Sequence, residues 1–237
     1  MGLDRPLKGK YWALYIDGTN FKVQRRGSTA REPSLVVLGI DDSHHRSILA
    51  IEPGSKDDVH SWEAVFATLK SRRLDGGAVR LGVMDGLPGL ESAFKRAFPN
   101  AATQRCWVHS LRNATAKSPA RLRDAFKMLA HKIMYAASEN DARLAFADLR
   151  TQMDGDGERA IRCLEKDLDS LLTFFRFDRA FWVALRTTNA IETINRQFKR
   201  RTRGMDTMGE QTLESVLAFT ALKIEMGWGL HRINSKL

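Results

Sequence analysis

The spacing of apolar residues changes along this 237-residue chain, and this change limits the folds open to it. In residues 11–24, apolar side chains such as Leu14 and Ile16 alternate with other residues, which predicts one long strand. Short apolar runs at 35–40 and 47–52 follow, and the polar turn between them predicts a hairpin. This part of the chain therefore predicts three antiparallel strands in succession.

In the next segment, helical spacing of apolar residues alternates with short apolar runs that are typical of buried strands. A helical spacing around Trp62 is followed by the buried strand 79–84, a helix over 88–98 and a further strand over 101–107. From about residue 110 onward the pattern is helical. We therefore predict an α/β fold in which a mixed five-stranded sheet is flanked by helices and the rest of the chain is helical.

The composition excludes several classes of protein. Apolar residues make up 43% of the chain, which supports a packed core rather than global disorder. No apolar stretch approaches the ~18–20 residues that cross a bilayer, so we expect no membrane partner. The two cysteines, Cys106 and Cys163, imply no disulfide framework and favour a reducing cytoplasm.

Positive charge is concentrated in two segments. The formal net charge is +10, and residues 101–132 contribute +6 while residues 186–203 contribute +5. The remainder of the chain is close to neutral. Clustered cations are typical of phosphate binding, which points to a polyanionic partner. The alternative is that these side chains only solvate helix faces.

Three carboxylates stand at unusual positions. Asp17 interrupts the first strand, and Asp85 ends the strand 79–84. A charge at such a position needs a partner or a metal, because burying it alone is costly. Glu192, within the second basic segment, is the natural third member of an acidic site for divalent ions.

The helix expected over about 189–202 has two stripes. Ile191, Ile194 and Phe198 form an apolar stripe. A separate polar stripe begins with the carboxylate of Glu192 and continues toward the C-terminus with three cations, Arg196, Lys199 and Arg203. This arrangement suits a metal ligand beside a phosphate-binding ridge. The alternative is an intrahelical ion pair between Glu192 and Arg196 on a solvated face.

Three blocks of the sequence together resemble a known family. They are YIDGTNFKV (15–23), MDGLPGLESAFKRAFPNAATQRCWVHSLRN (84–113) and LRTTNAIETINRQFKRRTRGM (185–205). In order and spacing they resemble the signature blocks of the Mutator-type transposases of bacterial insertion sequences.

The resemblance implies a DDE transposase with a ribonuclease H-like catalytic domain that an all-α insertion interrupts. Its first part would be 1–112, the insertion 113–184, and the completing helices 185–237.

The resemblance implies that Asp17, Asp85 and Glu192 form the acidic triad. They would hold two Mg²⁺ ions about 3.5–4 Å apart, with Mn²⁺ able to substitute. The expected activity is metal-dependent DNA cleavage and strand transfer at insertion-sequence ends, without a covalent enzyme intermediate.

The same resemblance suggests DNA-contacting residues: Arg105, His109, Arg112, Arg196, Lys199, Arg200 and Arg203. Cys106 and Asn189 are expected to support the site. The pair Cys106-x-x-His109 invites a zinc hypothesis, but no second pair of ligands stands at a suitable spacing. We therefore expect no zinc and a buried Cys106 at a strand end. His109 either lies near the active site or is an interior histidine.

The expected partner is DNA, both the terminal inverted repeats and the target, bound by a dimer or higher oligomer in the bacterial cytoplasm at the nucleoid. Family members carry a long N-terminal region that recognises the repeats, whereas Asp17 here lies near the start. We therefore expect a truncated protein with reduced sequence specificity. Two alternatives stay open: a catalytically idle DNA-binding remnant, and a ribonuclease H-like nuclease acting on branched or hybrid nucleic acid.

Overall fold

The computed structural model describes residues 5–7, 9–25, 28–153, 155–202 and 210–228. The chain divides into two compact units. The first combines residues 1–102 with 188–237, and the second comprises residues 103–187.

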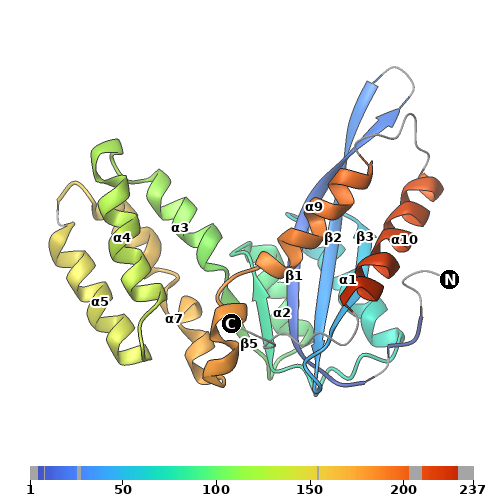
Figure 1. Ribbon diagram of the computed structural model, residues 1–237, viewed down its shortest axis with the longest axis horizontal. Coiled ribbons are helices and arrows are strands. Elements are labelled where there is room, and N and C mark those ends of the chain that lie inside the picture. Colours follow the sequence, from blue (N-terminus) through green and yellow to red (C-terminus); the bar gives the residue numbers. More distant parts are fainter. Residues whose placement is uncertain (1–4, 8, 26–27, 154, 203–209, 229–237) are drawn as a thin grey trace. The chain divides into compact units, whose positions relative to one another are not determined.

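A five-stranded mixed sheet forms the centre of the fold (Figure 1), as predicted. Its strands stand in the order β3-β2-β1-β4-β5. Strand β1 pairs antiparallel with β2 and parallel with β4, and β2 pairs antiparallel with β3. The strand bounds are β1 Tyr11–Arg25, β2 Ser28–Asp41, β3 Arg46–Pro53, β4 Leu81–Met84 and β5 Ala102–Arg105.

One face of this sheet buries the main apolar core. Alternate residues of a strand point to opposite faces, so Leu14 and Ile16 of β1 face one way. They pack with the buried aromatic side chains of α1 (Val59–Ser71) and α2 (Pro88–Ala97). In this core the rings of Phe66 and Phe98 lie 5.4 Å apart in an edge-to-face arrangement. Both helices lie behind the sheet in Figure 1.

The opposite face is covered by the C-terminal helices. Helix α9 (Asn189–Thr202) packs on β1, where Phe198 meets Phe21 edge to face with ring centroids 5.9 Å apart. Helix α10 (Glu210–Trp228) packs on β3. Its Glu225 accepts a hydrogen bond from the backbone N–H of Ile48 at 2.7 Å and pairs with Arg5 at 2.6 Å. These contacts join the last described helix to the edge of the sheet.

The second unit is helical after β5, as the periodicity predicts. It contains α3 Trp107–Ala116, η1 Ala120–Leu122, α4 Arg123–Met134, α5 Glu139–Gln152, α6 Glu158–Glu165, α7 Leu168–Leu171, η2 Thr173–Arg176, η3 Arg179–Phe181 and α8 Trp182–Leu185. Its core is built from buried side chains such as Phe126, Ile133, Phe146 and Leu164.

The stretch 159–175 is apolar-rich and helical, and the structure divides it into the separate pieces α6, α7 and η2. The buried amide of Gln104 bonds to the backbone where α7 ends and η2 begins. It donates to the carbonyl oxygen of Leu171 at 3.0 Å and accepts from the N–H of Phe174 at 2.7 Å. The indole of Trp107 donates to the same Leu171 carbonyl. These backbone groups therefore bond to side chains instead of continuing a helix.

No helix in the described part of the chain is long and apolar enough to cross a membrane.

Candidate active site

Two of the predicted acidic residues occupy neighbouring positions on the sheet. In the parallel pairing of β1 with β4, Ile16 stands opposite Met84, and Asp17 and Asp85 are the residues that follow. Adjacent strands lie about 4.8 Å apart. The register therefore brings the two positions side by side, where β4 ends and β1 continues. Ligand sites commonly form at this carboxyl end of parallel strands.

Asp17 faces helix α9. Because side chains alternate along β1, Asp17 lies on the same face as Phe21, which packs against Phe198 of α9. The structure also records a direct contact, in which Asn195 Nδ2 donates to Asp17 Oδ2 at 2.8 Å. The half-buried Asp17 carboxylate is therefore held by a side chain of the covering helix.

Helix α9 is placed by its apolar stripe. Its first turn closes with the N–H of Glu192 donating to the carbonyl of Thr188 at 2.9 Å. Ile191, Ile194 and Phe198 are buried against the unit, as the sequence predicts. Glu192 is half-buried and precedes Asn195 by three residues, so the two side chains are neighbours on the helix surface. The helix thus brings a third acidic residue toward the face that carries Asp17.

Asn195 was missed by reasoning from the sequence. It is only 4% exposed, and its Oδ1 is buried without a hydrogen-bond partner. The available signal was its spacing, because positions 191, 194, 195 and 198 form one continuous helical stripe and Asn195 is the polar member. A buried amide that uses its N–H on a carboxylate leaves an oxygen available for a cation or a water.

The donor set fits a hard cation. Carboxylate oxygens and an amide oxygen are the ligands that Mg²⁺ prefers. Within the described ranges, no three His, Cys, Asp or Glu side chains are gathered closely enough to form a metal site. Asp85 Oδ1 accepts the N–H of Gly86 at 2.7 Å. The structure thus places Asp17 beside Asp85 in register and Glu192 on the covering helix, while their action as a triad stays a prediction.

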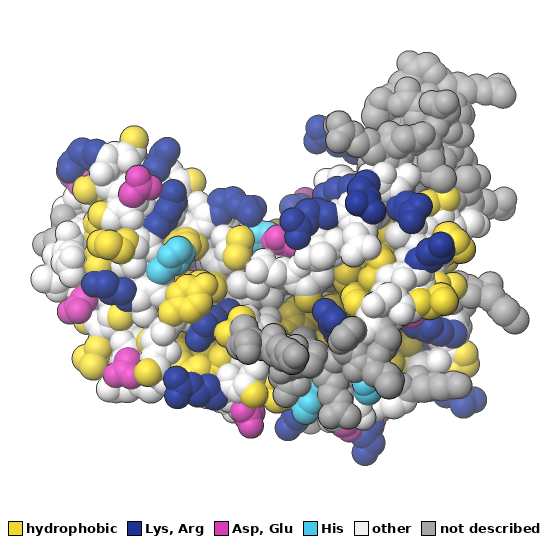
Figure 2. All heavy atoms as spheres, in the orientation of Figure 1, with side chains coloured by type: hydrophobic (Ala, Val, Ile, Leu, Met, Phe, Trp, Pro, Cys, Tyr) yellow, Lys and Arg dark blue, Asp and Glu magenta, His cyan; other side chains and the backbone are white. Residues whose placement is uncertain are grey.

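Cationic side chains extend from this helix. Arg196, Lys199 and Arg200 are exposed on α9, and Figure 2 shows Lys and Arg side chains gathered over α9 and α10. Arg196 donates to the hydroxyl of Thr193 at 3.0 Å. Asn189, the first residue of α9, is exposed. Arg203 lies outside the described residues.

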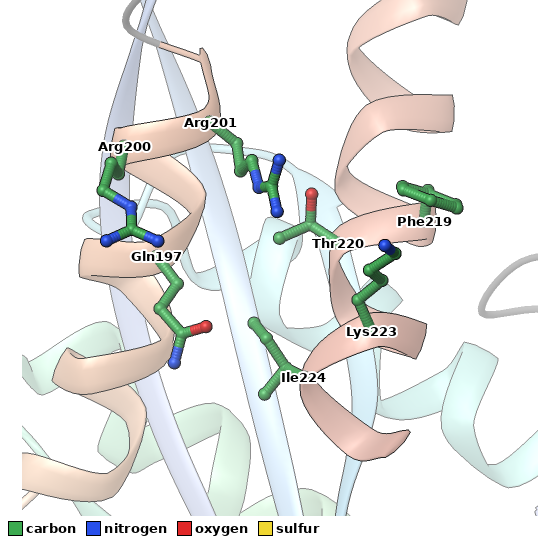
Figure 3. Close-up of a pocket in the computed structure, with 7 residues that line it drawn as sticks. All are labelled: Gln197, Arg200, Arg201, Phe219, Thr220, Lys223 and Ile224. Atoms are coloured by element: carbon green, nitrogen blue, oxygen red, sulfur yellow. The ribbon is translucent and has the colours of Figure 1, made fainter. Parts of the chain in front are cut away.

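A small pocket between α9 and α10 carries further positive charge (Figure 3). Its volume is about 180 Å³, and Arg200, Arg201 and Lys223 are among its lining residues. Gln197 and Thr220 supply neutral polar groups, one from each helix. Lys223 also lies over the ring of Phe219, with its Nζ 5.3 Å from the ring centroid. The cations of the α9 segment therefore continue onto α10.

The other predicted residues belong to the second unit. Arg105 Nη1 pairs with Asp167 Oδ1 at 2.5 Å, and the two side chains are only 16% and 14% exposed. Cys106 is buried at the end of β5, as expected, where it caps α3. His109 is half-buried and Arg112 is exposed on α3. Their roles as DNA contacts stay predictions.

Arg186 is a core residue, although it falls in the second basic segment. It is 6% exposed, and its guanidinium lies 5.0 Å from the ring centroid of Tyr135 and 4.9 Å from that of Phe174. Burial lowers the pKa of this arginine. Arg186 therefore packs between aromatic rings, and the surface charge of that segment comes from the side chains of α9.

Comparisons with known proteins find related sequences. Residues 3–223 match the family described as "Transposase, Mutator family". The chain is 30% identical over 201 residues to the transposase for insertion sequence element IS905 of Lactococcus lactis, covering 84% of this chain and 50% of the relative. It is 32% identical over 202 residues to the transposase for insertion sequence element ISRM5 of Rhizobium meliloti, covering 84% and 50%.

A third relative is the transposase for insertion sequence element IS6120 of Mycolicibacterium smegmatis. It is 28% identical over 210 residues, which cover 88% of this chain and 64% of the relative. The chain spans about half the length of the first two relatives.

Proposed function

Because the chain belongs to the Mutator family of transposases, we propose that it performs the catalytic step of transposition, metal-dependent DNA cleavage and strand transfer at the ends of an insertion sequence. One observation carries this proposal: Asp17 and Asp85 follow paired residues of adjacent parallel strands, and helix α9 covers that face with Glu192 and Asn195. The relatives are named as transposases of insertion sequence elements, which supports the same reaction class.

The proposed fold family is ribonuclease H-like. The strand order β3-β2-β1-β4-β5, with an antiparallel β1–β3 meander and a parallel β4, supports it. In this proposal residues 1–112 begin the catalytic core, residues 113–184 form the helical insertion, and residues 185–237 complete the core. The compact helical unit over residues 103–187 supports an insertion in this region.

Asp17, Asp85 and Glu192 are the residues that would hold Mg²⁺ or Mn²⁺. When bound, two such ions activate the attacking oxygen and stabilise the leaving 3′-oxygen of a DNA strand. The side chains of the protein contribute by positioning the metal-binding carboxylates and the DNA. The amide of Asn195 engages one oxygen of Asp17 and so fixes the orientation of that carboxylate. The cations Arg196, Lys199 and Arg200 attract the DNA backbone to the same helix.

The proposed partner is DNA, with terminal repeats and target bound in the same assembly. Joining transposon ends to a target calls for at least two catalytic subunits, so we expect a dimer or higher oligomer on DNA. In this proposal the protein works in the bacterial cytoplasm, in association with the nucleoid.

Nicking of supercoiled plasmid DNA in the presence of Mg²⁺ tests this function. Asp85→Asn keeps the size of the side chain and removes the charge, so nicking should fall about 100-fold or more. The control Asp42→Asn removes an exposed carboxylate from the turn between β2 and β3 and should nick at the parent rate. Circular dichroism of both variants checks the fold.

The alternatives give different results. A catalytically idle remnant would bind DNA with strong salt dependence and show no metal-dependent nicking. A ribonuclease H-like nuclease would cleave an RNA–DNA hybrid or a branched junction in preference to insertion-sequence ends. Nicking that persists unchanged in Asp85→Asn would overturn the assignment of the triad.

A further inference from the structure

The helical unit over residues 103–187 contains a groove of its own, between α3 and α4. Its volume is about 580 Å³, within the range of about 300–1,000 Å³ that is typical of sites for small molecules. All of its lining residues come from this unit. Asp17, Asp85 and Glu192 are not among its lining residues.

The lining combines apolar and cationic groups. Val108 and Leu111, half-buried on α3, supply apolar surface. Arg112, Arg123 and Lys127 supply exposed cations from both helices. Among the described residues that line the groove none is acidic. Figure 2 shows Lys and Arg side chains gathered over α3 and α4.

Two of these cations have recorded contacts. Arg123 donates through Nε to the carbonyl of Ser118 at 3.3 Å, which leaves the terminal nitrogens of its guanidinium for other acceptors. Lys127 Nζ lies 3.4 Å from Asp124 Oδ1, and Asp124 is fully exposed, so that pair is weak and easily exchanged. Both cations can therefore serve an anionic ligand.

A buried polar atom gives a second, independent sign of a ligand. Thr115 lines the groove and is 7% exposed, and its hydroxyl oxygen is buried without a hydrogen-bond partner. Such an atom costs stability when nothing satisfies it. Ligand sites typically place a few polar groups among apolar side chains, and these polar groups fix the orientation of what the site binds.

We propose that this groove binds single-stranded DNA, with an unstacked base against Val108 and Leu111 and the flanking phosphates on Arg112, Arg123 and Lys127. The imidazole ring of His131, which also lines the groove, offers a flat surface for stacking. The choice of nucleic acid as the ligand rests on the proposed function.

The chemistry favours a single strand over a duplex. A duplex presents phosphates and base edges on a convex surface, so it would meet the cations without using the apolar lining of a concave groove. An unstacked nucleotide offers an apolar face and a negative charge together, which matches this lining.

Fluorescence anisotropy with a labelled oligonucleotide of mixed sequence tests the proposal, in EDTA so that no cleavage interferes. The double variant Arg123→Ala, Lys127→Ala should bind single-stranded DNA more weakly. The slope of log affinity against log salt should fall in magnitude by about 0.7 for each lost phosphate contact. The matched control Lys132→Ala, Lys166→Ala removes two exposed cations of the same unit that do not line the groove. It should keep the parent slope.

The apolar lining is tested with an abasic oligonucleotide of the same length, which keeps the phosphates and lacks the bases. The parent chain should bind it at least about fivefold more weakly than the normal strand. Leu111→Ser should reduce this preference, and circular dichroism should show an intact helical fold. A blunt duplex of the same length is measured alongside. The proposal is overturned if the double variant binds single-stranded DNA like the parent, or if it loses as much affinity for the duplex as for the single strand. Equal affinity of the parent for the abasic and the normal strand would also overturn it.

These results are distinguishable from a failure of the proposed function. If nicking is absent but the double variant loses single-strand binding, the groove is supported and the catalytic assignment fails. If nicking depends on Asp85 but the groove variants bind like the parent, the catalytic assignment stands and the groove proposal fails.

Discussion

Asn195 occupies a position on α9 where the helical pattern calls for an apolar side chain. Burying an amide costs free energy unless its groups are hydrogen-bonded, and here one side of the amide is bonded to the Asp17 carboxylate at 2.8 Å. The charge on the acceptor makes this a strong kind of hydrogen bond. The contact also links the strand that carries Asp17 to the helix that carries Glu192. A single residue thereby couples two elements of the candidate site.

Asn195→Leu should keep the fold and impair the site. Leucine has the same branched shape, continues the apolar stripe and removes the buried Oδ1 that lacks a partner, which offsets part of the lost hydrogen bond to Asp17. We therefore expect the free energy of unfolding to fall by no more than about 1–2 kcal/mol. Loss of a residue that orients a metal ligand typically costs about 10- to 100-fold in metal affinity or activity. We therefore expect Mg²⁺-dependent nicking to need a higher Mg²⁺ concentration, which a metal titration of the nicking rate measures.

Gln197→Ala is the control for this variant, because Gln197 is exposed on the same helix. It should leave the Mg²⁺ dependence unchanged. An unaltered half-saturating Mg²⁺ concentration in Asn195→Leu would show that Asn195 does not position Asp17.

At the scale of elements, some backbone groups in the helical unit form hydrogen bonds with side chains that are distant in the sequence. Gln104, at the end of β5, is fully buried and bonds to backbone groups of Leu171 and Phe174. Trp107, at the start of α3, reaches the same Leu171 carbonyl at 2.8 Å. The segment containing α7 and η2 is therefore tied to the junction between β5 and α3. Gln104 and Trp107 both lie in the block 84–113, and each forms a hydrogen bond that holds the backbone of the helical unit.

Gln104→Leu should destabilise this unit. Leucine fills the space but leaves the N–H of Phe174 buried without its acceptor, which costs about 1–3 kcal/mol. Urea unfolding followed by tryptophan fluorescence measures this change. Gln152→Leu, at an exposed position at the end of α5, is the control and should stay close to the parent. If both variants unfold at the same urea concentration, the amide of Gln104 does not hold the segment.

At the scale of the whole molecule, the sheet is covered by helices on both faces, and its central strand β1 carries a run of buried residues from Tyr11 to Ile16. Tyr15 of β1 is fully buried, and this burial raises the pKa of its hydroxyl above the ordinary value of 10. The folded state therefore keeps this proton at a pH where the unfolded chain releases it. The associated stability is fully present below pH 10, and it is lost as the pH rises toward the folded pKa.

Tyr15→Phe should flatten the alkaline loss of stability. One such group contributes at most about 1.4 kcal/mol for each pH unit above the unfolded pKa. Urea unfolding at a series of alkaline pH values should give a shallower slope for Tyr15→Phe than for the parent. Tyr135→Phe, at a 61% exposed position, should keep the parent slope. Equal slopes for all three proteins would contradict the assignment.

The strands and helices were largely accessible from the sequence. The strand predicted over 11–24 is observed as Tyr11–Arg25, and the helix predicted over 88–98 as Pro88–Ala97. These predictions succeed because the period of apolar residues depends on burial of one local face. The change from α7 to η2 was not accessible, because the backbone there bonds to the amide of Gln104, a residue distant in sequence.

The sequence by itself determined the chemistry available to this protein: two carboxylates at strand positions, an acid and cations on one helix, and the period of each element. Only the tertiary structure decided which groups meet. The parallel register of β1 with β4 brings Asp17 and Asp85 to neighbouring positions, and packing of α9 brings Asn195 to Asp17. It also turned Arg186 from an apparent surface cation into a core residue. The physical reason is that the spacing of apolar residues in a segment reflects which face of that segment is buried. Strand register and side-chain partners depend instead on contacts between segments that are far apart in the sequence.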